Sequence, residues 1–261
     1  MYHTILYDVT AVDGGSIATI TLNRPERKNS IGPEMANEVL YALENAERED
    51  HVRAVILTGA GGHFCAGGDL GALSGGPMIA TLPLKGDYAD LMLAMMRYTR
   101  PIIARVEGVA MGGGLGLVAA SHFAIAAAGS VFATPEIHRG LWPMMISAVL
   151  ARTVARRDLL EMMLLGAKMP AEETARLRIV NRVVPHDHLD AEVMTLARSL
   201  AAKSPTAVAR GLAAWSRQGD VALAEALPML RDEFIGLLST DDAREGLMAF
   251  MEKRAPQWTG K

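Results

Sequence analysis

The sequence reads His63-Phe64-Cys65-Ala66-Gly67-Gly68-Asp69-Leu70 in one stretch and Gly108-Val109-Ala110-Met111-Gly112-Gly113-Gly114-Leu115-Gly116 in a second. Each stretch follows a short apolar run that is typical of a buried strand, and helix-compatible sequence comes after it. Turns of this kind can present bare backbone N–H groups to one cavity. Two N–H groups aimed at one carbonyl oxygen form an oxyanion hole, often the largest single contribution to catalysis. The two turns together predict an enzyme that stabilises an enolate or a similar oxyanion.

Predicted strands and helices alternate around the two turns. Apolar and polar side chains alternate on both sides of Asp13-Gly14-Gly15, which predicts a β-hairpin. Pro33 suits the first position of a helix that runs to about Arg48. The further predicted elements are strands over 54–58, 101–106 and 122–128 and helices over 87–99 and 115–120. The repeated strand–turn–helix order favours an α/β architecture.

The remaining segments are predicted to be a loop and a helical tail. Residues 71–86 are rich in Gly, Pro and Ser, which predicts a mobile loop over a site. From about Pro143 the sequence is predicted to be nearly all helical, and Pro228 should kink or divide one helix. The predicted tail helices span 189–202, 206–217, 221–238 and, after capping side chains at 239–242, about 243–254. Because such a tail cannot bury all its apolar faces alone, we expect a homo-oligomer.

Composition excludes several classes of function. The chain has 261 residues, of which 50% are hydrophobic, and a net charge of −3, so a nucleic-acid partner, which needs a basic face, is not expected. Cys65 is the only cysteine, which excludes an internal disulfide and fits a reducing compartment. The sequence contains no uncharged apolar run of about 20 residues, so no membrane span is predicted. The first ten residues include Asp8 and do not read as a secretory signal. We therefore expect a cytoplasmic protein.

Four common site signatures are absent from the sequence. No G-x-G-x-x-G follows either strand, and no G-x-x-x-x-G-K-[ST] occurs. A G-x-S-x-G nucleophile elbow and a paired C-x-x-C are also missing. These absences argue against a Rossmann enzyme, a P-loop NTPase, an elbow-type serine hydrolase and a structural zinc protein.

Over nearly its whole length the chain resembles the crotonase superfamily, the enoyl-CoA hydratases and isomerases. Five segments carry the resemblance in the family's order: a first CoA-contacting segment, two oxyanion segments, an acid/base segment and a C-terminal segment that reaches a neighbouring subunit's CoA. They are Leu22–Ile31, Phe64–Leu70, Gly108–Gly116, Phe132–Glu136 and Ala249–Arg254. The resemblance implies an α/β fold, with a crotonase-like spiral of ββα units over 1–200 and a helical C-terminal trimerisation region over 201–261.

The resemblance also implies roles for individual residues. The backbone N–H groups of Gly68 and Gly113 would bind the thioester oxygen, and Glu136 would be the acid/base. Apolar neighbours, such as Leu141, Trp142, Met144 and Met145, would raise the pKa of Glu136 toward the working pH. The CoA contacts would come from Arg24, Lys28, Ala66, Asp69 and Leu70 and, on a neighbouring subunit, from Phe250 and Lys253. CoA is expected as part of the substrate, with no permanently bound cofactor and no metal, in a homotrimer or a dimer of trimers.

One position departs from the hydratase pattern. Gly116 stands where a hydratase carries its second glutamate, and no titratable residue lies between Gly108 and Ser121. A single glutamate can still move a proton between two carbons, as the isomerases do, or hydrate slowly with a backbone-held water. Gly116 either gives the substrate room or allows close helix packing. Thioester hydrolysis, decarboxylation and a non-catalytic acyl-CoA-binding protein are the alternatives.

Four other side chains near the motifs have open or secondary roles. His122 stands where the family often has an acid, and His138 and Arg139 follow Glu136 closely enough to orient substrate or tune its pKa. Cys65 is expected to be inert, because no histidine stands at a telling position beside it. The methionine pairs 95/96, 144/145 and 162/163 are expected to fill core, with one pair free to line an acyl pocket.

Overall fold

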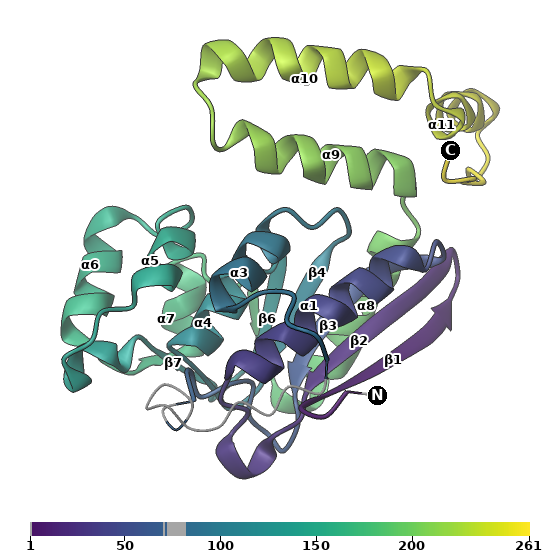
Figure 1. Ribbon diagram of the computed structural model, residues 1–261. Helices are drawn as coiled ribbons and strands as arrows, with labels where there is room; N and C mark the ends of the chain where they lie inside the picture. Colours follow the sequence, from purple (N-terminus) through teal and green to yellow (C-terminus); the bar gives the residue numbers. More distant parts are fainter. Residues whose placement is uncertain (1, 70, 72–81) are drawn as a thin grey trace.

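A six-stranded sheet with the strand order β1-β2-β3-β4-β6-β9 forms the centre of the computed structural model, which describes residues 2–69, 71 and 82–261 (Figure 1). β1 pairs antiparallel with β2, and every later neighbour in the sheet is parallel. The strands are β1 Ile5–Val12, β2 Gly15–Leu22, β3 Val52–Gly59, β4 Ile102–Val106, β6 Phe123–Ala127 and β9 Arg182–Val184.

Helices cover both faces of this sheet, which explains the nearly continuous apolar runs of its parallel strands. Successive residues of β3 point to opposite faces: Val55 and Leu57 join the larger core, and Ile56 joins a smaller one with Leu189 and Val193 of α8. The helices of the body are α1 Pro33–Arg48, α3 Tyr88–Met96, α4 Gly113–Ala120, α5 Met144–Leu150, α6 Arg156–Leu165, α7 Ala171–Arg176 and α8 Leu189–Ala201. The described part of the body also contains the 3-10 turns Pro25–Arg27, Pro135–Arg139 and His186–His188.

A smaller three-stranded sheet holds the second glycine turn. Its strands are β5 Val109–Met111, β7 Val131–Ala133 and β8 Met169–Pro170, in the order β5-β7-β8. β5 leads directly into α4, and β7 leads into the 3-10 turn that carries Glu136. The parallel pairing of β5 with β7 therefore brings the second glycine turn beside the Glu136 segment.

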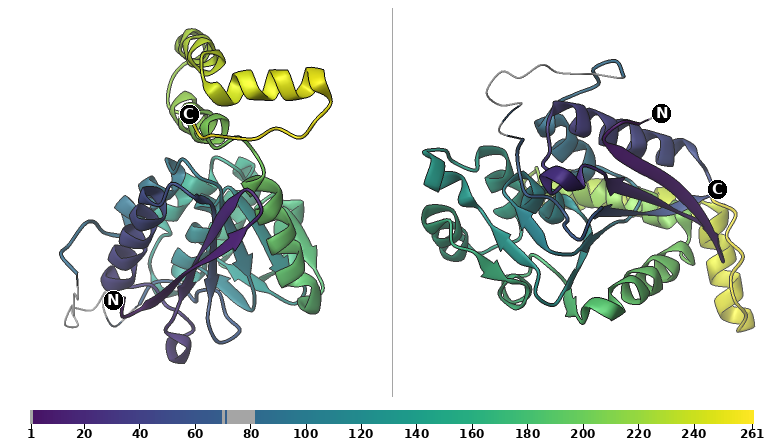
Figure 2. Two further views of the ribbon diagram at one scale, coloured as in Figure 1. Left: turned by 90° about the vertical axis from the view of Figure 1, so that its right-hand side faces the viewer. Right: turned by 90° about the horizontal axis from the view of Figure 1, so that it is seen from below.

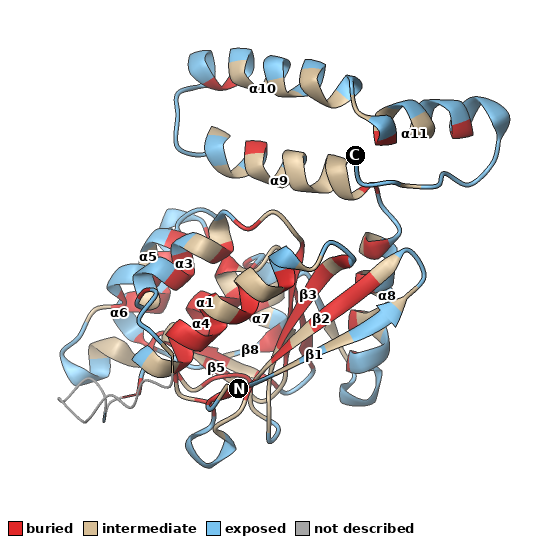
Figure 3. Cartoon of the chain, turned by 45° about the vertical axis from the view of Figure 1, so that its right-hand side comes forward, coloured by how far each residue is buried: buried red, intermediate tan, exposed pale blue. Residues whose placement is uncertain are grey.

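The last three helices, which we call the C-terminal arm (residues 205–261), lie apart from the sheet (Figures 1 and 2). They are α9 Pro205–Gln218, α10 Leu223–Leu238 and α11 Asp241–Glu252. The chain end folds back to the start of the arm, where Trp258 Nε1 donates to the Ala202 carbonyl at 2.9 Å and buried Asp242 accepts from Ser204. Figure 3 shows the contrast between the buried centre of the body and the arm, most of which is half-buried or exposed.

Most of the elements predicted from the sequence agree with the structure. The hairpin, the helix over 33–48 and the strands around 54–58, 101–106 and 122–128 are confirmed. The prediction of an almost wholly helical second half was wrong at β8 and β9, because strands of two and three residues are too short to show a period of two. Pro228 lies inside α10 without dividing it. Within the predicted mobile loop, residues 72–81 lie outside the described part of the chain.

No helix in the described part of the chain is long and apolar enough to span a bilayer.

Candidate active site

The two glycine turns are joined to one another by backbone hydrogen bonds. Cys65 N–H donates to the Val109 carbonyl and Met111 N–H donates to the Cys65 carbonyl, both at 2.9 Å. Gly67 and Gly112 adopt φ of +103° and +49°, which L side chains rarely tolerate. A Cβ on Gly67 would lie 2.9 Å from the Met111 carbonyl oxygen. The turns are therefore glycine-rich because they approach each other too closely for side chains.

A cavity of about 690 Å³ opens beside the joined turns. This volume lies within the usual range for a small-molecule site. Five parts of the chain surround it: the two turns, the start of α1, the start of α3 and the segment from Pro135 to α5. Its described lining residues are Ser30, Ile31, Gly32, Pro33, Ala66, Gly67, Gly68, Asp69, Gly71, Asp87, Tyr88, Gly112, Gly113, Pro135, Glu136, Arg139, Leu141, Trp142, Pro143, Met144, Met145 and Ile146.

The two predicted oxyanion donors line this cavity, and neither has an acceptor among the described residues. Neither the Gly68 N–H nor the Gly113 N–H donates to any atom of the described residues. The groups around Gly68 are engaged: Ile31 N–H donates to the Gly67 carbonyl, and Asp69 N–H donates to the Ile31 carbonyl. Gly113 is the first residue of α4, where free N–H groups and the helix dipole favour an anion. Since unpaired backbone donors are costly, these two are suited to bind an oxygen acceptor in the cavity.

Glu136 lies across the second turn on the 3-10 turn Pro135–Arg139. Its Oε1 lies 2.7 Å from the position that a Cβ on Gly112 would take, so the carboxyl contacts the bare turn. Its Oε2 is buried and has no hydrogen-bond partner among the described residues. Burial raises the pKa of Glu136, against the opposing effects of its own backbone N–H and of Arg139. A half-buried carboxyl with a raised pKa and an unused oxygen is suited to general acid–base chemistry.

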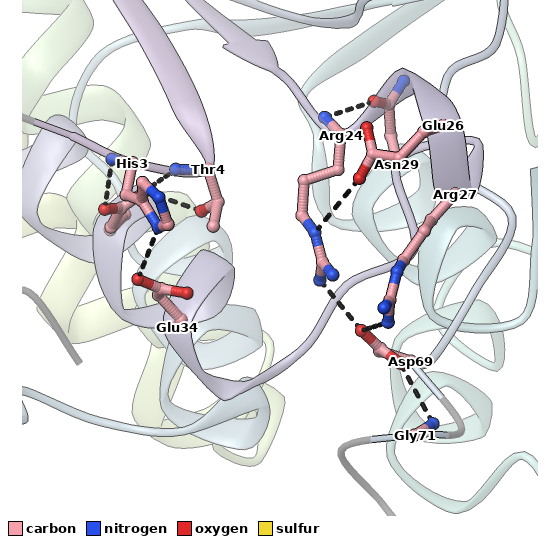
Figure 4. Close-up of polar contacts among 10 residues, drawn as sticks. His3, Thr4, Arg24, Glu26, Arg27, Asn29, Glu34, Asp69 and Gly71 are labelled. Carbon is pink, nitrogen blue, oxygen red and sulfur yellow. Dashed lines mark hydrogen bonds and ion pairs between the residues drawn. The ribbon is translucent and has the colours of Figure 1, made fainter. Parts of the chain in front are cut away.

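The other two acids that line the cavity are already bonded. Asp69 accepts from Arg24 Nη1 at 2.8 Å, from Arg27 Nη1 at 3.3 Å and from Gly71 N–H at 3.0 Å (Figure 4). Asp87 caps α3, where its Oδ1 accepts from two backbone N–H groups of the first turn. Among the described lining residues, Glu136 is therefore the carboxylate best placed to exchange a proton with a bound molecule.

Apolar side chains form another part of the cavity lining. Leu141, Trp142, Met144 and Met145, which the sequence suggested as walls beside Glu136, all line it, and Ile146 joins them from α5. Met144 is 69% exposed, so the cavity meets solvent there. The pairs Met95/Met96 and Met162/Met163 pack in or against the larger core instead. The methionine pair that lines the cavity is therefore 144/145.

Only some of the residues predicted to contact CoA lie at the cavity. Ala66 and Asp69 line the cavity, and Arg24 is bound to Asp69 beside it. Lys28 is exposed and forms no ion pair with any described residue. Leu70 lies outside the described residues. Phe250, 83% exposed, and Lys253 belong to α11 and its C-terminal cap, and they do not line the cavity of their own chain.

Gly116 faces two side chains rather than open space. A Cβ there would overlap the Tyr88 hydroxyl and the Ile146 side chain. Of the two explanations considered for this glycine, close packing is therefore correct. Sequence reasoning missed Tyr88, because nothing in a local pattern says which distant side chain fills the space that a glycine leaves.

The two histidines near the site contact backbone groups, and the cysteine is buried. His122 Nδ1 accepts from Ile102 N–H at 3.0 Å, and burial lowers the His122 pKa to about 4, so the ring stays neutral. His138 Nε2 lies 3.2 Å from the Gly166 carbonyl oxygen. Cys65 is fully buried, and burial raises its pKa to about 12, which keeps it a thiol. An uncharged buried thiol is a poor nucleophile.

Comparison with known proteins adds a family assignment to this geometry. The family model described as enoyl-CoA hydratase/isomerase matches residues 13–261. The chain is 32% identical over 252 residues to enoyl-CoA hydratase EchA19 of Mycobacterium tuberculosis, covering 95% of this chain and 94% of that protein. It superimposes on an enoyl-CoA hydratase of Mycobacterium smegmatis with a TM-score of 0.90 and 33% identity, over 98% of this chain and 99% of that one. An enoyl-CoA hydratase of Bacillus anthracis gives a TM-score of 0.90 at 30% identity, over 99% of this chain and 100% of that one.

Proposed function

The chain belongs to the enoyl-CoA hydratase/isomerase family of the crotonase superfamily, and from this premise we propose that it acts on an acyl-CoA thioester through an enolate. The Gly68 and Gly113 N–H groups bind the thioester oxygen, and Glu136 moves the proton. One observation carries the proposal: two backbone donors and one buried carboxylate oxygen, all without partners among the described residues, belong to residues lining a single cavity.

The chemistry follows from where charge develops. Removal of a proton from the carbon next to the thioester carbonyl leaves an enolate whose negative charge resides mainly on oxygen. Two fixed N–H donors stabilise that oxygen more than the neutral carbonyl, so they lower the barrier rather than only tightening binding. Glu136 takes the proton when ionised and returns it when protonated, and burial, which raises its pKa, makes it a stronger base than an ordinary glutamate.

The leading reaction is a double-bond shift by a single glutamate. Asp69 and Asp87 are held by hydrogen bonds, and Gly116 has no side chain, so the described lining lacks a second unengaged acid beside Glu136. A glutamate that delivers the abstracted proton to another carbon of the same substrate completes an isomerisation without water. Hydration remains the second candidate because the related proteins of M. tuberculosis, M. smegmatis and B. anthracis are named enoyl-CoA hydratases.

A panel of 2-enoyl- and 3-enoyl-CoA esters in H₂¹⁸O, read by mass spectrometry, tests the proposal. Isomerisation leaves the substrate mass unchanged but moves its double bond, whereas hydration adds one ¹⁸O. Glu136→Gln should reduce turnover by about 10²–10⁴-fold, the usual contribution of a positioned acid/base. Undiminished turnover in this variant would overturn the role of Glu136. Release of free CoA or of CO₂ would point to thioester hydrolysis or decarboxylation, and tight binding without any turnover to a non-catalytic binding protein.

We also propose that Lys28 and, with its Asp69 contact rearranged, Arg24 bind CoA phosphates. Basic side chains form strong charge-assisted hydrogen bonds with phosphate oxygens. Lys28→Gln should weaken CoA-ester binding, and Lys168→Gln, which changes an exposed lysine in a segment with none of the proposed CoA contacts, serves as the control. Equal affinities of both variants and the unmodified protein, measured by calorimetry, would contradict this part of the proposal.

The C-terminal arm is proposed to join the chain to copies of itself, as a homotrimer or a dimer of trimers. Its apolar side chains Trp215, Leu223 and Met251 are each at least 70% exposed, an arrangement that marks an interaction surface when such residues are grouped. In such an assembly Phe250 and Lys253 would contact the CoA of a neighbouring subunit. Sedimentation should give three or six times the chain mass of 27.9 kDa, and a monomer at micromolar concentration would contradict the proposal.

A further inference from the structure

The side chain of Tyr88 lies against the second glycine turn. Tyr88 is the first residue of α3 and lines the cavity. Its hydroxyl donates a hydrogen bond to the Gly113 carbonyl oxygen at 2.6 Å. Its ring atom Cζ lies 3.5 Å from the position that a Cβ on Gly113 would take. The tip of the phenol therefore contacts the residue that carries one of the two proposed oxyanion donors.

Backbone hydrogen bonds hold the second turn up to Gly112: the Met111 N–H donates to the Cys65 carbonyl and the Gly112 N–H to the Ala133 carbonyl, both at 2.9 Å, and Gly113 follows directly. α4 begins after Gly112 and starts with Gly113 and Gly114, and its N-cap offers no side-chain hydrogen bond. Consecutive glycines lose the most conformational freedom on folding, and none of them has a side chain that can hold the turn. An oxyanion donor works only if it is held in place before the charge develops. The Tyr88 hydroxyl supplies such a contact from a different helix.

Gly116 complements Tyr88. It lies three residues after Gly113, on the same face of α4. A Cβ at Gly116 would overlap the Tyr88 hydroxyl, so any larger residue at this position would displace the phenol. Burial raises the pKa of Tyr88 well above its ordinary value, so the hydroxyl keeps its proton for the Gly113 carbonyl. The position where a hydratase has its second acid is thus, in this chain, the space for the tyrosine hydroxyl.

We propose that Tyr88 is a positioning residue for the oxyanion site, whose hydroxyl holds Gly113 in the orientation in which the Gly113 N–H binds the thioester oxygen, and that Gly116 is glycine in order to admit this hydroxyl. The inference rests on the proposed function, because it assigns Tyr88 a part in binding that oxygen. It predicts that loss of the hydroxyl weakens binding of the transition state more than binding of the substrate.

The test is Tyr88→Phe, which keeps the ring and removes only the hydrogen bond. The kcat for the panel substrate with the highest turnover should fall by about tenfold, less than the roughly hundredfold loss expected from a fully misplaced group, while KM changes by less than about twofold. Tyr98→Phe is the matched control, because the Tyr98 hydroxyl also donates to a helix carbonyl, that of Leu43, at 2.7 Å, and Tyr98 does not line the cavity. The control should lose similar thermal stability and keep its kcat.

A second readout does not depend on turnover. Butyryl-CoA carrying ¹³C at the thioester carbonyl is bound to the full chain, and the carbonyl stretch is recorded by difference infrared spectroscopy. The wild-type protein should lower the stretching frequency, because hydrogen bonds polarise the carbonyl. Tyr88→Phe should lose about half of that shift, since one of the two donors is loosened. Placing 4-aminophenylalanine at position 88, which restores a donor, should recover the shift.

The outcomes separate the two proposals. A wild-type protein that binds butyryl-CoA without any carbonyl shift would overturn the proposed oxyanion site itself. A normal wild-type shift that is unchanged in Tyr88→Phe, together with unchanged kcat, would leave the proposed function standing and overturn the role of Tyr88. If Tyr88→Phe does not fold, Gly116→Ala provides the second variant, because its Cβ displaces the hydroxyl while Tyr88 itself is retained. Gly116→Ala must then show the same reduced carbonyl shift, and a full shift would overturn the inference.

Discussion

The cavity has two walls of opposite construction. One, the glycine wall, consists of Gly67, Gly68, Gly112 and Gly113 and offers backbone atoms alone. The other, the side-chain wall, consists of Glu136, Leu141, Trp142, Met144 and Met145. The glycine wall is packed so tightly that a Cβ on Gly67 or Gly112 would lie within 3 Å of another atom, whereas Met144 of the side-chain wall is mostly exposed.

The two walls determine different kinds of specificity. Backbone donors are fixed by the fold, so the glycine wall serves what every thioester shares, its carbonyl oxygen. Side chains can change without moving the backbone, so the side-chain wall can determine which acyl group fits and at what pH the acid/base works. Substitutions at the glycine wall should therefore lower both stability and turnover. Substitutions in the side-chain wall should change KM or the pH dependence alone.

The largest effect is expected behind the glycine wall, at Gly114→Ala. A Cβ there would overlap the Cys65 carbonyl oxygen, a backbone atom that cannot rotate away. Overpacking of a close backbone contact costs about 1–3 kcal/mol or more, and the shift would separate the two turns. Chemical denaturation should show this loss, together with the loss of turnover.

Gly211→Ala is the matched control for Gly114→Ala. Gly211 also lies inside a helix, α9, but nothing lies within 4 Å of the position its Cβ would take. The substitution should raise the free energy of unfolding by about 0.5–1 kcal/mol through helix propensity. If both variants behaved alike, the steric account of the glycine wall would be wrong.

An intermediate effect concerns the pH dependence set by Glu136. Burial raises its pKa, so the acid limb of kcat/KM, below which the base is protonated, should lie above the pH expected for an ordinary glutamate. Arg139 lowers the same pKa, so Arg139→Gln should move the limb to still higher pH. A pH–rate profile with the limb unmoved or at lower pH would contradict the role of Arg139.

The same raised pKa has a consequence for stability. The folded protein binds the Glu136 proton more tightly than the unfolded chain does, so this stabilisation is fully present below the unfolded pKa and is lost as the pH rises through the folded one. Glu136→Gln cannot titrate, so its stability relative to wild type should increase from pH 4 to pH 8. Denaturation curves at the two pH values check this, and a constant difference would show that Glu136 is not the buried acid described.

The smallest effect is expected at the mouth of the side-chain wall, at Met144→Ala. Met144 is largely exposed, so its removal should change stability by less than about 0.5 kcal/mol. It should raise KM for long acyl chains by about fourfold, since one lost methylene contact is worth about 0.8 kcal/mol. Leu164→Ala, exposed on α6 and absent from the cavity lining, is the control and should leave KM unchanged. An unaltered KM in both variants would mean that the acyl chain leaves by another path.

The sequence predicted the glycine wall better than the rest of the site. Local signals suffice there, because a glycine required by a turn or a close approach is visible as a glycine. The apolar wall at residues 141–145 was predicted for a similar reason, since it follows Glu136 directly in the chain. Tyr88 could not be predicted, because its contact with Gly113 joins residues far apart in the sequence. β9 was missed for the same reason: three residues become a strand only through pairing with β6.

Exchange of carbon-bound hydrogen shows whether Glu136 and the two glycine donors convert a bound acyl-CoA to its enolate. Butyryl-CoA is incubated with the protein in D₂O, and deuterium entering at the carbon next to the thioester is followed by mass spectrometry. We expect incorporation by the wild-type protein and a rate lower by about 10²-fold or more in Glu136→Gln, whichever overall reaction the protein catalyses. Equal rates in both proteins, or incorporation no faster than in solution without protein, would contradict this expectation.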